Sequence, residues 1–146
     1  MKLVADASVA VKWVLPAPGI EADADRAAEL LSAVRKNAVE LVQPPHWLAE
    51  VAAVISRLSP EIAAQAIELL DALELTVEAD AEIYKRASRI ARQLDQHLFD
   101  TLYHALALER DAVLVTADDR YLRKARTLGG VVSLADWRPP AAVAEE

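Results

Sequence analysis

The chain has no cysteine among its 146 residues, and only three are glycine. The lack of cysteine excludes disulfide bonds, thiolate metal sites and cysteine nucleophiles. The scarcity of glycine, together with abundant alanine, favours a helix-rich fold. Hydrophobic residues make up 54% of the chain and charged residues 27%, which is typical of a folded globular protein. The length suits one domain with one core.

No apolar stretch approaches the roughly 20 residues that a membrane span needs. The sequence also opens without the apolar core of a signal peptide, so we expect a cytoplasmic protein with no membrane contact. The net charge of −7 argues against a broadly basic nucleic-acid-binding surface. A cluster of acids in a metal site would contribute to that charge, and bound divalent cations would return positive charge locally.

Short apolar runs alternate with longer amphipathic segments along the whole chain. Strands are predicted at residues 2–5, 40–43, 75–77, 112–116 and 131–134. Helices are predicted at residues 7–14, 22–36, 46–58, 60–73, 81–94, 98–109 and 119–126. The first helix is predicted to end before a turn at Pro18–Gly19. Ser59 is the predicted N-cap of the helix at 60–73, and Asp80 that of the helix at 81–94. The buried stripe of the helix after Asp80 is predicted to consist of Ile83, Ala87, Ile90 and Leu94.

Strands that are apolar throughout and separated by helices predict a parallel sheet covered on both faces. We find no internal repeat and no interdomain linker. The sequence therefore predicts a single domain over residues 1–137. Residues 138–146, which contain Pro139–Pro140 and end in two glutamates, are predicted to form a loosely ordered tail.

Two acidic residues follow predicted strands. Asp6 ends the first strand, and Asp118 lies two residues past the strand at 112–116. In an open parallel sheet, ligands bind beyond the carboxyl ends of the strands, where the strand order reverses. Both carboxylates are therefore expected at the same rim of the sheet.

Two further acids, Glu50 and Asp100, interrupt nonpolar helical stretches near the first turns of their helices. A carboxylate in such surroundings is costly unless a cation pairs with it, and no lysine or arginine lies one turn away from either residue. Hard divalent cations such as Mg²⁺ prefer carboxylate oxygens and would resolve the repulsion among converging acids. One or two such ions could activate a water for attack on a phosphodiester.

Simpler interpretations of the same acids remain open from the residues alone. Asp6 could cap a helix, and Asp118 could be a turn residue or a cap. Glu50 could face solvent, because Arg57 shares its helical face two turns on. Spacing by itself does not choose between these roles and a metal site.

Four segments carry a resemblance to a known family: Val4–Trp13, Ala49–Val51, Phe99–Ala107 and Leu114–Asp118. They look like the four motifs of PIN domains and, more narrowly, of the VapC toxins of prokaryotic type II toxin–antitoxin systems. The resemblance implies a three-layer α/β/α sandwich with a mostly parallel central sheet. It also implies a Mg²⁺- or Mn²⁺-dependent endoribonuclease that acts on RNA, forms a homodimer and is inhibited by a cognate VapB antitoxin.

Carried over by position, the resemblance assigns catalytic and metal-binding roles to Asp6, Glu50, Asp100 and Asp118. It also implies that Ser8 and Thr116 hydrogen-bond to the ligating carboxylates and orient them.

The chain departs from the family pattern at three places. Ala53 stands where many relatives carry asparagine, which puts the surroundings of Glu50 in doubt. Thr101 stands where a smaller residue is usual. Asp119 adds an acid beside Asp118, so which of the two faces the metal is open.

RNA binding requires some positive surface. The candidate phosphate contacts are Lys12, Arg120, Arg123 and Lys124. A second basic stripe, formed by Lys85, Arg89 and Arg92, is predicted to be an ordinary solvated face. Structural or surface roles, and not metal ligation, are predicted for His46, His97 and His104, because the other candidate ligands near them all carry oxygen donors.

Two other functions compete with the nuclease. A phosphoacceptor receiver domain also has acids at strand ends, but it would need an aspartate after the third strand and a lysine after the last. Here Val77 is followed by Glu78, and Val132 by Ser133. A noncatalytic interaction module on a PIN-like fold is the second rival, and the presence of all four acids argues against it.

Overall fold

The protein, described here by a computed structural model that covers residues 1–15 and 22–141, is built on a parallel sheet. Within those residues the strands are β1 (Lys2–Ala5), β2 (Glu40–Gln43), β3 (Thr76–Val77), β4 (Val113–Thr116) and β5 (Val131–Ser133). They lie in the order β3-β2-β1-β4-β5, and each neighbouring pair is parallel. The predicted turn at Pro18–Gly19 and the last five residues of the predicted tail lie outside the described residues.

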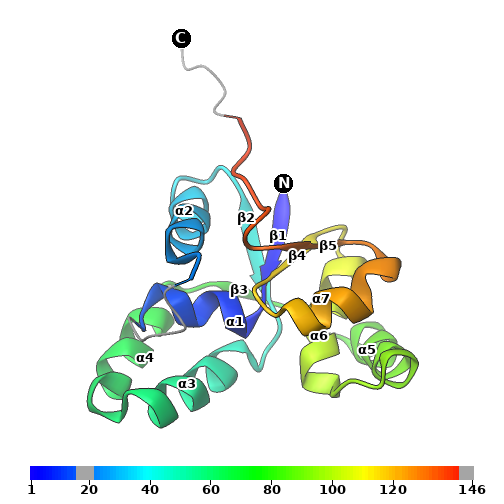
Figure 1. Cartoon of the computed structure of the whole chain (residues 1–146), viewed down its shortest axis with the longest axis horizontal. Coiled ribbons are helices and arrows are strands. Elements are labelled where there is room, and N and C mark those ends of the chain that lie inside the picture. The colour runs from blue at the N-terminus through cyan, green and yellow to red at the C-terminus, as the bar shows by residue number, and fades with distance from the viewer. Residues whose placement is uncertain (16–21, 142–146) are drawn as a thin grey trace.

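Helices connect the strands and cover both faces of the sheet (Figure 1). They are α1 (Ala7–Ala10), α2 (Ala24–Arg35), α3 (Trp47–Leu58), α4 (Ala63–Asp71), α5 (Ala81–Leu94), α6 (Leu98–Glu109) and α7 (Asp119–Ala125). Short 3₁₀ turns at Val11–Trp13, Pro60–Ile62 and Arg126–Leu128 extend α1, precede α4 and follow α7. No helix in the described ranges is both long and apolar enough to cross a bilayer.

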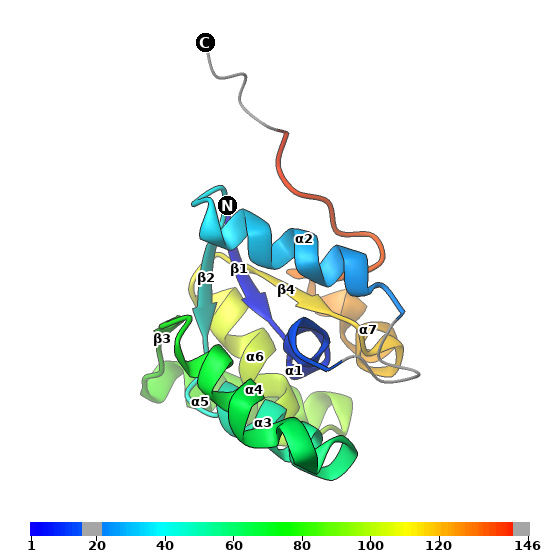
Figure 2. The ribbon, with the colours of Figure 1, turned by 90° about the vertical axis from the view of Figure 1, so that its left-hand side faces the viewer.

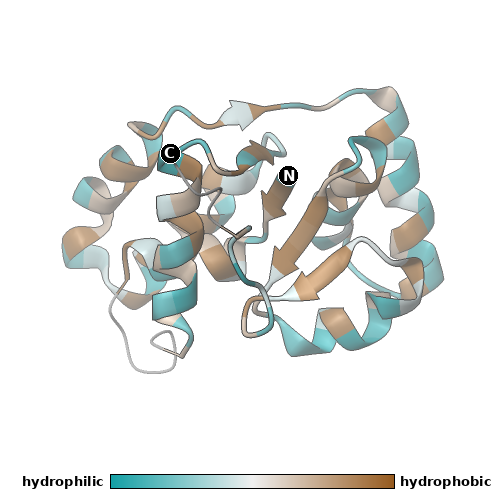
Figure 3. Ribbon diagram, turned by 90° about the horizontal axis from the view of Figure 1, so that it is seen from above, coloured by the Kyte–Doolittle hydropathy of each residue, from teal (hydrophilic) through white to brown (hydrophobic). Residues whose placement is uncertain are grey.

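The strand side chains point alternately to two separate cores. Val4 and Leu114 pack into the larger core with α3, α4, α5 and α6, whereas Leu3 and Val115 pack against α2 on the other face. Figure 2 shows α2 on one side of the strands and α6 on the other, and Figure 3 shows most of the strands in the brown of hydrophobic residues. The predicted three-layer α/β/α sandwich is confirmed.

The strand order creates the crevice that matters for function. From β1 the chain passes to β2 and β3 on one side, and then returns to β4 on the other side of β1. The order therefore reverses at β1, and the carboxyl ends of β1 and β4 meet at the switch point where ligands bind in such sheets. A receiver domain has the order 2-1-3-4-5 instead, so the receiver interpretation is wrong.

The segment around Ser59 differs from the prediction. Asp80 caps α5 as predicted, accepting a hydrogen bond from the Ile83 amide at 3.0 Å. Ser59 makes no side-chain cap, and the following segment begins as a 3₁₀ turn with α4 starting only at Ala63. The reason is that Ser59 also ends α3, where its main-chain amide donates to the Ile55 carbonyl at 2.8 Å.

The predicted buried stripe on α5 is largely confirmed. Ile83, Ala87 and Ile90 are buried, and Leu94 is partly buried.

A buried glutamine closes the sheet just before the crevice. Main-chain pairing between β1 and β2 covers Lys2 with Glu40 and Leu3 with Leu41. Further along, the fully buried Gln43 side chain takes over: its Oε1 accepts from the Ala5 amide at 2.8 Å, and its Nε2 donates to the Ala5 carbonyl at 2.9 Å. This side chain therefore satisfies both main-chain groups of the residue that precedes Asp6.

Replacing Gln43 with leucine is expected to lower the free energy of unfolding by about 2–4 kcal/mol, because two buried main-chain groups of Ala5 lose their partners. Urea denaturation followed by circular dichroism measures the effect. The matched control is Gln93→Leu, at an exposed position of α5, for which we expect a change within about 0.5 kcal/mol. Equal stability of the two variants would contradict this role of Gln43.

Candidate active site

Three of the four predicted acids line one cavity of about 530 Å³ at the carboxyl end of the sheet. Asp6 follows β1, Glu50 lies in the first turn of α3, and Asp100 lies in the first turn of α6. Lys12 and Ala53 also line this cavity. The fold therefore brings together carboxylates that are far apart in the chain.

The Asp6 carboxylate is held by hydroxyl groups from two elements. Its Oδ2 accepts from the Ser8 hydroxyl at 2.5 Å, from the Ser8 amide at 3.2 Å and from the Thr116 hydroxyl at 3.4 Å. Ser8 Oγ in turn accepts from the Ala117 amide at 2.9 Å. The Asp6 main-chain amide donates to the Val115 carbonyl at 3.0 Å, so β1, α1 and β4 are tied together around this side chain.

The charge of Asp6 is costly in this position. Burial raises its pKa to about 6, the hydrogen bonds from Ser8 oppose the rise, and the negative charges of Glu50 and Asp100 add to it. Unfavourable desolvation and like-charge repulsion therefore coincide at the carboxylate next to β1.

Glu50 is held by a buried tyrosine. The Tyr103 hydroxyl donates to Glu50 Oε1 at 2.7 Å. Burial is the main cause of a raised pKa of Tyr103, and the charge of Glu50 adds to it, so this hydroxyl stays protonated. His46 Nε2 lies 3.4 Å from the same oxygen and 2.7 Å from the Phe99 carbonyl. Burial raises the pKa of Glu50, and Asp100 adds to the rise, against the effects of Tyr103 and His46.

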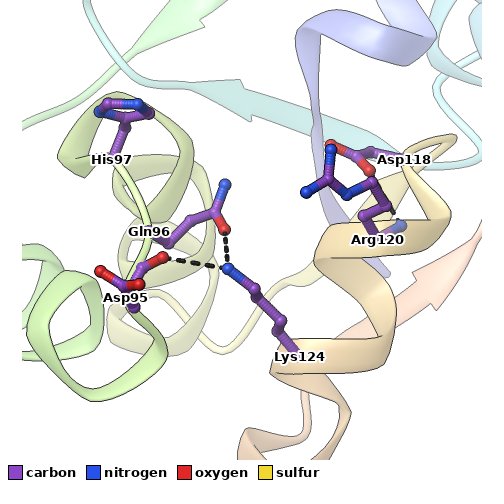
Figure 4. A pocket seen from close by; sticks show the side chains of 6 residues that line it. All are labelled: Asp95, Gln96, His97, Asp118, Arg120 and Lys124. Atoms are coloured by element: carbon purple, nitrogen blue, oxygen red, sulfur yellow. Dashed lines mark hydrogen bonds between the residues drawn. The ribbon is translucent and has the colours of Figure 1, made fainter.

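Asp100 is held by a neutral amide. Gln96 Nε2 donates to Asp100 Oδ2 at 2.7 Å. The other end of the same amide, Gln96 Oε1, accepts from Lys124 Nζ at 3.0 Å, and Lys124 also donates to the Asp95 carbonyl at 3.0 Å. Figure 4 shows Lys124 extending from α7 to these two acceptors in the α5–α6 connection.

Asp118 lines a neighbouring cavity of about 520 Å³ and not the one that the other acids share. Its Oδ1 caps α7 by accepting from the amides of Arg120 at 3.0 Å and Tyr121 at 3.1 Å. Its own main-chain amide donates to Thr116 Oγ1 at 3.0 Å, and the same hydroxyl donates to Asp6 Oδ2, so Thr116 links the main chain of Asp118 to the carboxylate of Asp6. The cap predicted as an alternative for Asp118 is therefore present.

The hydrogen bonds to the four acids share one feature. In each carboxylate they all end on a single oxygen, and no donor within the described ranges reaches the second oxygen. The occupied oxygens are Oδ2 of Asp6, Oε1 of Glu50, Oδ2 of Asp100 and Oδ1 of Asp118. Each side chain is therefore oriented while one oxygen stays available as a ligand.

The donor set fits a hard divalent cation in its chemistry. Carboxylate oxygens are the ligands that Mg²⁺ and Mn²⁺ prefer. Burial is the main cause of the raised pKa of Asp6, the charges of Glu50 and Asp100 add to it, and a bound cation would offset both effects. In the part of the chain that the structure describes, no group of three or more histidine, aspartate or glutamate side chains is placed to hold a metal ion as it stands. The acids share a cavity without forming a ready-made cluster.

The candidate phosphate contacts are divided between the cavities. Lys12 lines the cavity of the three acids and donates to the Ala22 carbonyl at 2.7 Å. Arg120 and Lys124 line the cavity of Asp118. Arg123 is exposed on α7 and is not among the residues that line either cavity.

Sequence reasoning missed the neutral donors of the site. A lysine or arginine is the partner expected for a carboxylate in apolar surroundings, whereas the structure uses the Tyr103 hydroxyl for Glu50 and the Gln96 side-chain amide for Asp100. Gln96 was detectable, because it stands four residues before Asp100. The contact of Tyr103 with Glu50 joins α6 to α3 and has no sequence signal.

His104, as predicted, is structural: it is buried between the Tyr121 hydroxyl and the Gly129 carbonyl.

The comparisons with known proteins agree on the fold. A family model for the PIN domain matches residues 3–127. The crystal structure of PAE2754 from Pyrobaculum aerophilum is similar with a TM-score of 0.64 and 16% identity, over 92% of this chain and 90% of that chain. At that identity the likeness is one of fold alone. No curated protein matches the chain significantly.

Replacing Asp6 with asparagine is expected to stabilise the metal-free protein above pH 6. Because the pKa of Asp6 rises from 3.8 to about 6 on folding, the folded state binds more protons than the unfolded state between these values. The stability of the wild type therefore falls as the pH rises through this window, whereas asparagine keeps the hydrogen bonds from Ser8 without the charge. We expect the variant to be more stable by about 2 kcal/mol near pH 7.5.

Urea denaturation in the presence of a chelator, at several pH values, measures this difference. It should narrow as the pH falls toward about 4, where the wild-type carboxyl is protonated in the folded state. Asp119→Asn, at an exposed position of α7, is the control and should show no comparable pH dependence. A stability difference that is the same at all pH values would contradict the assigned cause.

Proposed function

Because the chain belongs to the PIN domain family, whose members are generally nucleases, we propose that it is a Mg²⁺- or Mn²⁺-dependent endoribonuclease. The observation that carries the proposal is the shared cavity. Asp6, Glu50 and Asp100 come from three separate elements and line one space at the carboxyl ends of β1 and β4. This cavity thus lies at the switch point where open parallel sheets bind small molecules. Its carboxylates are the donors that phosphodiester hydrolysis with a hard metal ion requires.

In this proposal the metal is held by the three carboxylates, with Asp118 at the edge of the site. When bound, a divalent ion supplies an activated water and stabilises the charge that develops on the phosphate. Ser8 and Thr116 orient the Asp6 carboxylate, and Tyr103 orients that of Glu50. Asp119 has no part in this assignment, because it is Asp118 that caps α7 and contacts Thr116.

The RNA backbone would lie across both cavities. Lys12 stands in the cavity of the acids, and Arg120 and Lys124 stand beside Asp118. Cationic side chains next to a metal site hold phosphates and fix the register of the strand without reading its sequence. Arg123 is the most peripheral of the proposed contacts, since it lines neither cavity.

We also propose that the protein is the toxin of a VapBC pair, that it forms a homodimer, and that a VapB-type antitoxin inhibits it. The support is the resemblance of four segments to VapC motifs, which span almost the whole chain in order. An antitoxin that inhibits the site would lay a segment in a groove near the acids and direct a cation toward them. Cleavage of RNA by the free protein would then be the toxic activity.

Neutral isosteres of the cavity acids are expected to abolish cleavage. For Asp6→Asn, Glu50→Gln and Asp100→Asn we expect loss of RNA cleavage by at least about 100-fold with Mg²⁺ or Mn²⁺, because each removes a charged ligand of the metal. Cleavage of a fluorescently labelled RNA measures the loss, with circular dichroism to show that each variant is folded. Expression in a bacterial host should arrest growth for the wild type but not for Asp6→Asn.

The matched control for these variants is Asp119→Asn, which also removes one carboxylate charge but lies outside both cavities and should cleave as the wild type does. Cleavage of equal rate by wild type and Asp6→Asn would mean that the assigned site is wrong. A wild-type protein that neither binds Mn²⁺ nor cleaves RNA would favour the noncatalytic module.

Replacing Arg120 with methionine is expected to weaken RNA binding and to reduce the slope of log affinity against log salt by about 1, since one phosphate contact is lost. Fluorescence anisotropy of labelled RNA in the Asp6→Asn background measures binding without cleavage. Arg123→Met removes the same charge from the same helix and should have the smaller effect. If the two variants weaken binding equally, the cavity beside Asp118 is not a specific phosphate contact.

A further inference from the structure

The hydrogen-bonded chain from Lys124 through Gln96 to Asp100 links a cation to a site carboxylate without direct contact between them. We infer that Gln96 is a positioning residue for the metal site: it fixes Asp100 by one oxygen and is itself anchored by Lys124. The inference rests on the proposed function, since it concerns the affinity of the same site for its metal. It assigns a role to two residues that lie outside the set of acids.

The chemistry of the two ends fixes the orientation of the Gln96 amide. Lys124 carries only hydrogen-bond donors, so it must face the amide oxygen, and the Asp100 carboxylate carries only acceptors, so it must face the amide nitrogen. The distances of 3.0 Å and 2.7 Å agree with this arrangement. A bond from an ammonium to the amide oxygen polarises the amide and strengthens the bond that its nitrogen donates.

The backbone around Gln96 holds the side chain in place. Helix α5 ends at Leu94, and its C-cap Asp95 has the left-handed value φ = 51°. The main-chain N–H of Gln96 donates back to the Ala91 carbonyl at 2.9 Å. Helix α6 then begins at Leu98, so Gln96 stands before the first turn that carries Asp100. The two helices are joined inside the protein by the buried Thr101 hydroxyl, which donates to the Ala87 carbonyl at 2.8 Å.

Lys124 extends this support from a third element. It lies in the last turn of α7, and its two bonds join α7 to the α5–α6 connection across the cavity of Asp118 (Figure 4). No ion pair joins Lys124 to a carboxylate among the described residues. A lysine bonded directly to Asp100 would compete with a metal for that carboxylate, whereas the intervening amide orients it and leaves Oδ1 available.

The test compares Gln96→Leu, which has a side chain of similar size but neither accepts nor donates, with Gln93→Leu at an exposed position of α5. Mn²⁺ binding in the absence of RNA is measured by electron paramagnetic resonance of the free ion. We expect Gln96→Leu to raise the Kd for Mn²⁺ by about 10-fold, the usual scale for losing a group that orients a ligand. Gln93→Leu should leave the Kd unchanged.

A double-mutant cycle tests whether Lys124 acts through Gln96. Lys124→Met should raise the Kd for Mn²⁺ less than Gln96→Leu does, and the double variant should be no weaker than Gln96→Leu alone. Arg123→Met removes an equal charge from the same helix and should have no effect on the Kd. Additive effects of the two substitutions would overturn the role of Lys124 as an anchor of Gln96.

Kinetic constants separate metal positioning from the chemical step. At saturating Mn²⁺, the kcat of Gln96→Leu should approach that of the wild type, because Gln96 orients a ligand of the metal and takes no part in the reaction itself. Wild-type cleavage with unchanged Mn²⁺ affinity in Gln96→Leu would overturn this inference alone. A wild-type protein without Mn²⁺ binding would overturn the proposed function instead. If Gln96→Leu unfolds, Lys124→Met decides: unchanged Mn²⁺ affinity in that folded variant overturns the inference.

Discussion

A buried carboxylate that shares one cavity with two others is the constraint around which this site is built. Asp6, Glu50 and Asp100 are brought together at the end of the sheet, and the pKa of Asp6 rises to about 6 as a result of burial and of its charged neighbours. Hydroxyl and amide groups hold the acids, so neutral donors orient each of the three carboxylates.

The scaffold supplies the rigidity that such an arrangement needs. Asp6 can be placed beside β4 because the main chain of Ala5 is fixed by the buried Gln43 side chain and because its own amide bonds to Val115. The helices that carry the other two acids pack on one face of the same sheet. Strain or looseness in either core would therefore move carboxylates relative to one another and change the affinity of the site for a cation.

Local sequence patterns predicted most of the architecture. Strands such as 112–116 are short, apolar and bounded by turns or charged residues, so their burial and parallel pairing followed from composition and spacing. The role of Ser59 did not follow, because a residue between two helices can serve as the end of one and fail as the cap of the next. The partition of the acids between two cavities was also beyond sequence reasoning, since it depends on how α7 leaves β4.

The sequence by itself determined the layered α/β fold and which acids stand at strand ends and helix starts, because hydrophobic periodicity and capping are properties of neighbouring residues. Only the tertiary structure decided the partners of those acids. Tyr103 reaches Glu50 from another helix, and Lys124 reaches Gln96 across a cavity. Such contacts depend on the relative placement of whole elements, which packing of the two cores sets and no local pattern encodes.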